Sequence, residues 1–219
     1  MNNIGISYTL KRTPRARNIT IKVTAAGEVI VSAPKYFVSQ TQIAQFVQSA
    51  SSWIEKQKIA HKEKPSLFSN THAFVFGEKL TITETNNKDG EIKVYGEQLR
   101  VSPVRDKKSE IEKWLKNRAI EYMLIRLPIL AKKMDVTFRA VSFKKQSTRW
   151  GSCSSQKNLN FNWKLIHAPK EVIDYVLIHE LAHLTHMNHS SAFWDRVAQF
   201  DPDYPHHRRW LHKYGETED

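Results

Sequence analysis

Three segments near the start of the chain alternate between hydrophobic and polar positions. They are ISYTLKR (6–12), NITIKVT (18–24) and EVIVSA (28–33), all rich in β-branched residues. A period of two over such short runs predicts strands with one buried face. After Ser39, which suits a helix N-cap, the hydrophobic positions recur at helical spacing to about Lys62. The start of the chain is therefore expected to form a small sheet followed by one long helix.

A second group of strands is predicted between residues 72 and 102. Its segments are HAFVF, LTITET, EIKVY and QLRVS, and NNKDG (86–90) has the composition of a hairpin turn between the second and the third. A helix follows, in which Pro128 is expected to produce a kink or an end. The residues expected to be buried in this helix are Ile111, Trp114, Leu115, Tyr122 and Met123. We place a domain boundary where strands give way to helix, between residues 1–103 and 104–219.

The last third of the chain alternates again and then turns helical. VTFRAVSF (136–143) and NLNFNWKLI (158–166) read as strands, and STRWGSCSSQKN (147–158) between them reads as a loop. A hydrophobic helix, EVIDYVLIHELAHLTH (171–186), follows Pro169, a residue common in first helical turns. Two shorter helices, SAFWDRVAQF and HRRWLHKY, complete the chain. Together these elements predict an α+β fold.

Composition narrows the class of protein. Hydrophobic residues make up 40% of the 219, and six are Trp, so the chain can form a packed core. Cys153 is the single cysteine, which excludes an intrachain disulfide and fits a reducing compartment. The first residues lack a secretory signal pattern, and no hydrophobic run is long enough for a membrane helix. We therefore expect a soluble cytoplasmic protein without a membrane partner.

The net charge is +12 and the pI is about 9.7. Such an excess of positive charge attracts polyanions. The basic residues, however, run from Lys11 and Arg12 to Arg208 and Arg209 along the sequence, whereas a dedicated binding stripe would be more clustered. No motif of interleaved basic and aromatic residues supports a nucleic-acid partner. We therefore favour a basic enzyme.

The segment HELAH (179–183) has the spacing of a metal site. Residues four apart share one face of a helix, so His179 and His183 can bind the same ion. Glu180 can then act on a water molecule without being a ligand. A helix with ordinary surface histidines is the alternative, but a carboxylate among so many apolar neighbours is costly unless it has a task or a partner.

Two histidines compete for the role of third ligand. His189 lies ten positions after His179, and Asn188 before it suits a turn that brings the chain back. His186 is three residues after His183 and is expected to remain on the helix, so we favour His189. Three histidines leave a fourth position for water, which is typical of catalytic zinc. The expectation is one Zn²⁺ per chain.

Three segments together resemble a known family. RWGSC (149–153), NFNWKLIHAP (160–169) and HELAHLTHMNHSSAFW (179–194) are similar to motifs of the YgjP-like metallopeptidase family, among the gluzincin and SprT-like zinc peptidases, with the strong match over about residues 135–212. The resemblance implies a zincin-type helix–strand–helix core within 104–219 and a strand above the cleft. It also supports His189 as a ligand.

The function expected from these features is zinc-dependent peptide hydrolysis with Glu180 as general base. Two alternatives remain open. One is a metal-dependent nucleotide (nucleoside triphosphate) pyrophosphatase, an activity attributed to some family members and compatible with the basic charge, although no Gly-rich phosphate loop is present. The other is a SprT-like protease that acts on DNA-bound proteins. The partner is accordingly a peptide or protein, or a nucleotide in the first alternative.

Six residues are candidates for contact with substrate. Arg149 can hold a carboxylate or phosphate or can pair with Asp174, and Trp150 can line the cleft or lie in the core. Asn160 and Asn162 alternate away from the hydrophobic side of their strand, where an extended peptide can pair.

The remaining two candidates, Tyr204 and His206, lie in a late turn together with His207. Each can stabilise an oxyanion. Cys153 is more simply explained as a small buried thiol than as a metal ligand.

Overall fold

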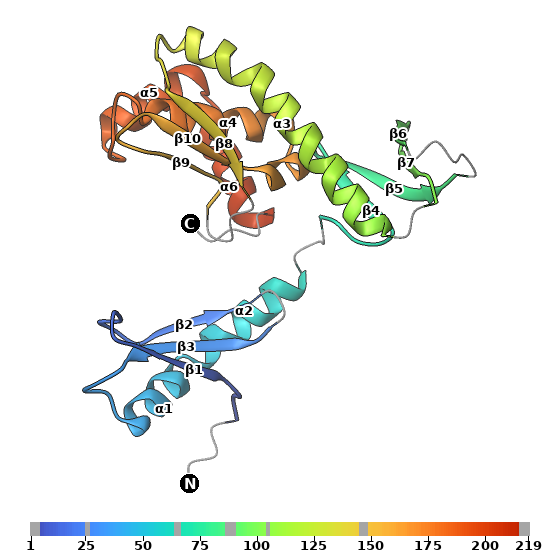
Figure 1. The fold of residues 1–219 in the computed structure, drawn as a ribbon. Helices are drawn as coiled ribbons and strands as arrows, with labels where there is room; N and C mark the ends of the chain where they lie inside the picture. Colours follow the sequence, from blue (N-terminus) through green and yellow to red (C-terminus); the bar gives the residue numbers. More distant parts are fainter. Residues whose placement is uncertain are drawn as a thin grey trace. The chain divides into compact units, whose positions relative to one another are not determined.

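The computed structural model describes residues 5–24, 27–63, 67–85, 91–103, 106–144 and 149–214. Within these ranges the chain combines α-helices with three small sheets, so the α+β prediction is confirmed (Figure 1). The chain divides into two compact units, residues 1–65 and 66–219, here called the amino-terminal and carboxy-terminal units. No helix of the described chain is long and apolar enough to cross a membrane.

The amino-terminal unit is a three-stranded sheet with two helices. Its elements are β1 (Thr9–Thr13), β2 (Thr20–Val23), β3 (Val29–Pro34), α1 (Gln40–Ser49) and α2 (Ser51–Glu63). β3 is central, parallel to β1 and antiparallel to β2. The three predicted strands are confirmed, and Ser39 is the N-cap of α1 in a capping box with Gln42. The single predicted helix is instead two, because Ala50 closes α1 with bonds to the carbonyls of Phe46 and Gln48.

Both helices cover the same face of this sheet. The buried cluster joins sheet and helix residues: Val23, Val29, Val31, Ala33, Ile43, Val47 and Ile54. Along β3, the buried residues alternate with partly exposed Ile30, Ser32 and Pro34. The strand is therefore hydrophobic toward the helices and more polar on its other face.

The carboxy-terminal unit begins with a four-stranded sheet. Its strands are β4 (His72–Val75), β5 (Glu78–Glu84), β6 (Ile92–Tyr95) and β7 (Gln98–Val101), in the order β4-β5-β7-β6. All four strands were predicted. The predicted pairing of the second with the third is wrong, because β7 lies between them, parallel to β5 and antiparallel to β6. A tight turn at Gly96, with φ 53°, closes the β6–β7 hairpin. The NNKDG segment lies outside the described residues.

This sheet packs with the rest of the carboxy-terminal unit, so the compact units divide at residues 65 and 66 instead of after residue 103, where we expected the boundary. Leu80 and Leu99 belong to the same buried cluster as the helices that follow. The turn between β4 and β5 also fits closely against the start of a later helix, since a Cβ on Gly77 would lie 2.9 Å from Cγ of Pro169.

Helix α3 (Lys107–Lys133) spans the unit, with Asp106 as its N-cap. Pro128 does not end it, and the helix continues to Lys133 with Pro128 on its exposed side. Of the residues predicted to be buried in this helix, Ile111, Leu115 and Met123 are buried, and Trp114 and Tyr122 are partly buried.

The last sheet and helices surround the candidate site. Strands β8 (Ala140–Lys144), β10 (Asn158–Asn162) and β9 (Gly151–Cys153) form a sheet in that order, followed by a 3-10 helix, η1 (Trp163–His167), and by α4 (Lys170–Ala182), α5 (Ser191–Phe200) and α6 (Tyr204–Tyr214). β9 falls in the segment predicted to be a loop, and η1 replaces the second half of the last predicted strand. In the order of this sheet β10 is central and β9 is at an edge.

Candidate metal centre

The HELAH segment lies at the end of α4, a helix that is hydrophobic on most of its surface. Its buried residues include Ile178 just before the motif and Leu181 within it, and Glu180 itself is only 5% exposed. His179 is in the last turn and His183 is the C-cap, with ring centroids 5.0 Å apart. The one-turn spacing therefore brings two imidazoles together at the point where the helix ends.

His189 completes a cluster with these two residues. One ring nitrogen from each of His179, His183 and His189 lies within 4.8 Å of the others, and Nε2 of His189 is 3.2 Å from Nε2 of His179. Two nitrogens bound to one tetrahedral zinc lie about 3.3 Å apart, given the usual Zn–N distance. The three residues therefore fit a single metal ion.

The chain after α4 explains why His189 joins the cluster and His186 does not. Nδ1 of His183 donates a hydrogen bond to the backbone carbonyl of His186, at 3.0 Å. This bond leaves Nε2 of His183 as the acceptor nitrogen and orients the ring. His186 thus contributes its carbonyl, while the chain beyond it returns His189 to the end of the helix.

Burial favours the neutral form of two rings of the cluster, those of His179 and His183. It lowers the pKa of His179 to about 3, with the charges of His183, His189 and Arg208 acting in the same direction. Burial also lowers the pKa of His183. A neutral imidazole has a lone pair for a metal ion, so these histidines are in the required protonation state at neutral pH.

Aromatic side chains of α5 pack around the histidines. The ring of Phe193 lies 4.9, 4.5 and 4.8 Å from those of His179, His183 and His189, and Trp194 stacks on His189 at 5.7 Å. Nδ1 of His179 is buried and has no hydrogen-bond partner among the described residues. Ring packing therefore orients His179.

Glu180 lies directly against strand β9. A Cβ on Gly151 would lie 2.6 Å from Oε1 and 2.7 Å from Cγ of Glu180, closer than side-chain atoms approach one another. Any larger residue at 151 would displace the carboxylate. The sequence pattern indicates no role for Gly151, although a glycine within a strand often marks a close approach of another group.

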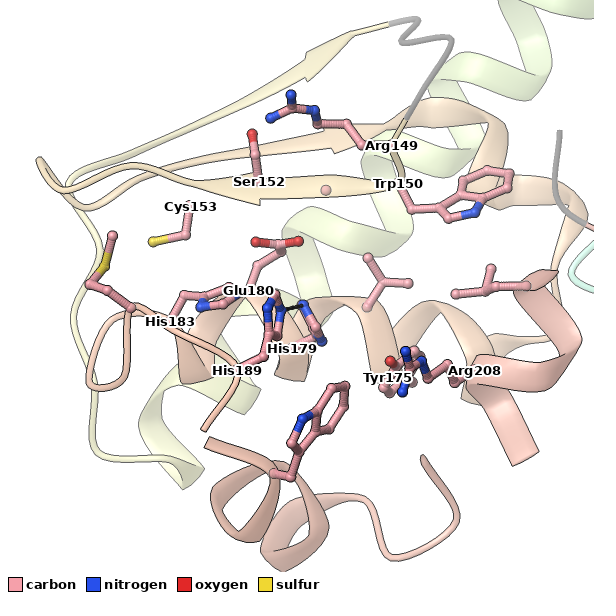
Figure 2. A pocket seen from close by; sticks show the side chains of 15 residues that line it. Arg149, Trp150, Ser152, Cys153, Tyr175, His179, Glu180, His183, His189 and Arg208 are labelled. Carbon is pink, nitrogen blue, oxygen red and sulfur yellow. Dashed lines mark hydrogen bonds between the residues drawn. The ribbon is translucent and has the colours of Figure 1, made fainter. Parts of the chain in front are cut away.

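A pocket of about 690 Å³ opens between β9, α4 and α6 (Figure 2). The residues lining it are the three histidines and Glu180, together with Arg149, Trp150, Gly151, Ser152, Cys153, Tyr175, Val176, Met187, Trp194, Arg208 and Leu211. The cluster is thus reached from a cavity large enough for several residues of a ligand.

Arg149 and Trp150 are the two predicted substrate residues that line this pocket. Trp150 is buried, and the Arg149 side chain points away from Glu180 and the histidines (Figure 2). Asp174, considered as a partner of Arg149, pairs instead with Arg126, at 2.5 Å, and accepts a hydrogen bond from the hydroxyl of Tyr122 at 3.0 Å. That pair joins α3 to α4.

Asn160 and Asn162 do not line the pocket. They lie in β10, whose two edges are already paired with β8 and β9. Asn160 accepts a hydrogen bond from the hydroxyl of Ser142, and Asn162 is fully buried, where its side-chain oxygen accepts from the backbone N–H of Lys164 at 3.1 Å. The expectation that an extended peptide pairs with this strand is therefore corrected, since a central strand has no free edge.

Tyr204 and His206 are also absent from the pocket lining. Tyr204 stacks on Trp194, with centroids 5.2 Å apart, and His206 is exposed. Two residues that the sequence did not single out are present instead: Arg208 on the same helix and Tyr175 on α4. Tyr175 lies one helical turn before His179, a spacing that could have identified it. Nothing in the sequence separates Arg208 from the other arginines.

Cys153 lines the pocket but lies outside the histidine cluster. Burial raises the pKa of its thiol to about 11, and the charge of Glu180 adds to the effect. The side chain is therefore a neutral thiol at physiological pH.

Comparison with known proteins identifies the family of this chain. A sequence model of the YgjP-like metallopeptidase domain matches residues 17–214. The chain belongs to the YgjP-like metallopeptidase family. It is therefore a hydrolase of the metallopeptidase class, and the family match includes most of both compact units.

A solved structure gives a more distant likeness. It is the crystal structure of the metallopeptidase zymogen abylysin from Pyrococcus abyssi, with which this chain shares 22% sequence identity and a TM-score of 0.38. The similarity covers 42% of this chain and 95% of that one. Among curated proteins, none matches the sequence.

Proposed function

We propose that the protein is a zinc-dependent peptidase in which His179, His183 and His189 hold one Zn²⁺ and Glu180 is the general base. The observation that carries this proposal is the convergence of three ring nitrogens within 4.8 Å beside a buried carboxylate. Three neutral imidazoles favour zinc over magnesium or calcium, which prefer oxygen ligands. Three protein ligands also leave a position open for chemistry.

The roles of the metal ion and of Glu180 in hydrolysis follow from their positions. When bound, the metal supplies a Lewis acid that polarises the scissile carbonyl and lowers the pKa of water to about 7. Glu180 accepts the proton of the attacking water and delivers it to the leaving amine. Its burial excludes bulk water, and the contact with Gly151 limits the positions that the carboxylate can adopt.

Arg208 and Tyr175 are the groups that we assign to the oxyanion. Both line the pocket, and the guanidinium of Arg208 is held over the ring of Trp194, with Cζ 5.0 Å from the ring centroid. Trp194 in turn contacts His179 and His189. A fixed cation next to the reacting carbonyl stabilises negative charge as it develops. These residues replace Tyr204 and His206 in that role.

The edge strand β9 is the surface that we assign to the substrate backbone. It borders the pocket through Gly151, Ser152 and Cys153, and in the described sheet one of its edges is paired with β10. An extended peptide that adds to the other edge gains main-chain hydrogen bonds without a specific sequence. This arrangement supports a peptide or protein substrate.

The test combines metal analysis with hydrolysis. Purified protein should contain about one zinc per chain, as expected for a single three-ligand site. It should cleave an unstructured protein such as casein, lose this activity on treatment with a chelator, and regain it with zinc. Nucleoside triphosphates assayed in parallel test the pyrophosphatase alternative. Metal-dependent release of pyrophosphate without any peptide cleavage would overturn the proposal.

A further inference from the structure

The positive charge of the chain is concentrated in its smaller unit. Residues 1–65 contain ten Lys and Arg and three Glu, a net charge of +7 out of +12 for the whole chain. Residues 66–219 contain 24 Lys and Arg and 19 Asp and Glu, which leaves +5 on more than twice the length. The basic residues that look dispersed along the sequence are therefore unevenly divided between the two units.

Within the amino-terminal unit, the topology brings several of these cations to one end of the sheet. β1 and β3 are parallel, so the loops that leave them start at the same end, and the backbone N–H of Lys35 donates to the carbonyl of Thr13 at 3.2 Å. These loops carry exposed Arg15, Arg17 and Lys35, which we call the basic end. Glu28 lies in the turn before β3, at the opposite end, and is the single acidic residue between positions 5 and 47.

Two aromatic side chains project from the same end. Tyr36 is 61% exposed and Phe37 is fully exposed, and their rings meet edge to face at 6.4 Å. Phe37 also has φ 65°, a left-handed conformation that residues other than glycine adopt rarely. A large apolar side chain held in solvent on a strained backbone is unfavourable for the isolated unit, which suggests a contact with a partner.

Arg12 fixes this loop against the sheet. Its guanidinium donates hydrogen bonds to the carbonyls of Pro34 and Val38, at 3.2 and 3.0 Å. These two bonds bracket Tyr36 and Phe37. The rings are therefore presented next to the basic end by a fixed loop.

The sheet face opposite the helices also carries cationic and hydroxyl side chains. The strand register aligns two rows of residues across it: Lys11, Ser32 and Thr20 in one, and Thr9, Ile30 and Lys22 in the next. Apart from Ile30, these side chains are hydroxyls and ammonium groups, which bind phosphate and sugar oxygens. No carboxylate is present in these rows.

We propose that the amino-terminal unit binds single-stranded nucleic acid, with its phosphates at the basic end and a base stacked on Phe37 or Tyr36. Cations that follow a backbone, combined with flat rings on which bases stack, are what sequence-independent single-strand binding requires. An anionic membrane fits less well, because the open sheet face is polar. An acidic peptide would not use the faces of two aromatic rings. The activity is separate from hydrolysis at the metal centre.

The test uses the full chain and fluorescence anisotropy. The probes are a labelled 20-nucleotide DNA strand of mixed sequence, the RNA of the same sequence, and the DNA duplex. Contacts with about three phosphates predict a loss of roughly 20-fold in single-strand affinity between 50 and 200 mM salt. Absence of single-strand binding at 50 mM salt, or a preference for the duplex, would overturn the proposal.

Charge reversal tests the location of the site. Changing Arg15, Arg17 and Lys35 together to Glu should lower the affinity by about 20-fold or more at 50 mM salt, because three phosphate contacts are lost. The matched control reverses three exposed lysines of α3, namely Lys108, Lys116 and Lys132. It changes the net charge equally and should reduce the affinity by less than about threefold if the contacts are local. Equal losses in the two variants would indicate general electrostatic attraction and contradict the assigned site.

Replacement of Phe37 identifies the kind of partner. Phe37→Ala should weaken single-strand binding by about 5-fold to 150-fold, the range for loss of one stacking ring. Phe37→Trp should retain the affinity, and Phe37→Leu, which remains apolar but has no aromatic face, should behave like Ala. Vesicles containing phosphatidylserine and a poly-glutamate competitor are measured alongside. Vesicle binding that Phe37→Leu preserves, or displacement by poly-glutamate with no effect of Phe37→Ala, would reject a nucleic acid in favour of a membrane or an acidic protein.

Discussion

The two compact units differ in how far their functional polar and charged side chains are buried. In the carboxy-terminal unit Glu180 is 5% exposed, and His179 is surrounded by aromatic rings and has its pKa lowered to about 3 by burial. In the amino-terminal unit Arg15, Arg17 and Lys35 are exposed, and Phe37 stands fully in solvent. Burial changes the protonation of a side chain and suits it to catalysis. Exposure leaves a charged group accessible to a partner and suits it to recognition, so the comparison agrees with the proposed hydrolysis in one unit and the proposed binding in the other.

The largest effect is expected from removal of a metal ligand. His189→Ala should weaken zinc binding by more than about 100-fold, since a lost ligand costs more than a lost supporting contact. His186→Ala is the matched control, and it should retain zinc because residue 186 supports His183 through its backbone carbonyl. Competition with a chromogenic chelator measures both. Weaker zinc binding by the residue 186 variant would reassign the third ligand.

Loss of the base should separate zinc binding from activity. Glu180→Gln should retain about one zinc per chain and lower kcat by roughly 10²–10⁴-fold, because the amide cannot accept a proton. Glu171→Gln changes the same charge on the exposed start of α4 and should leave kcat unchanged. Turnover at the wild-type rate by the residue 180 variant would disprove the assigned mechanism.

Loss of the Arg208 side chain should destabilise the transition state more than the bound substrate. Arg208→Ala should lower kcat by about 10²–10³-fold, the usual cost of one oxyanion donor, with a smaller change in KM. Arg209→Ala removes the neighbouring exposed cation, which does not line the pocket, and should have little effect. An increase in KM with unchanged kcat would make Arg208 a substrate-binding residue instead.

Gly151→Ala tests the contact between β9 and Glu180. The added methyl group would overlap the carboxylate, so kcat should fall while zinc is retained; a displacement of about 1 Å can cost roughly 100-fold. Gly5→Ala is the control, because a Cβ at that position of the amino-terminal unit has no atom within 4 Å. Full activity of the residue 151 variant would mean that Glu180 tolerates movement and that its position is not critical.

The smallest effect is expected for charge reversal at the basic end, which tests whether the two units have separate functions. Reversal of Arg15, Arg17 and Lys35 should leave zinc content and the hydrolysis of a short peptide unchanged within about twofold, as surface substitutions away from a site usually do. Steady-state kinetics on a short peptide measures this. A large loss of kcat would show that the amino-terminal unit takes part in catalysis.

The sequence alone determined the features that depend on neighbours along the chain. Alternating and helical periods located most strands and helices, and Ser39 was identified as a cap from its position. The four-residue spacing of His179 and His183 requires only that the segment is helical. The HExxH motif and its flanking segments led to the family that the comparison then identified.

Only the tertiary structure decided the features that depend on distant segments. The order β4-β5-β7-β6, the packing of that sheet with α3, and the central position of β10 come from pairings that no local pattern encodes. Gly151 meets Glu180, and Arg208 reaches the pocket, because strands and helices far apart in sequence pack together. The basic end likewise exists because parallel pairing of β1 with β3 joins two loops, whereas along the chain the same residues look dispersed. Periodicity records which face of an element is buried, but the identity of its partner is set by long-range packing.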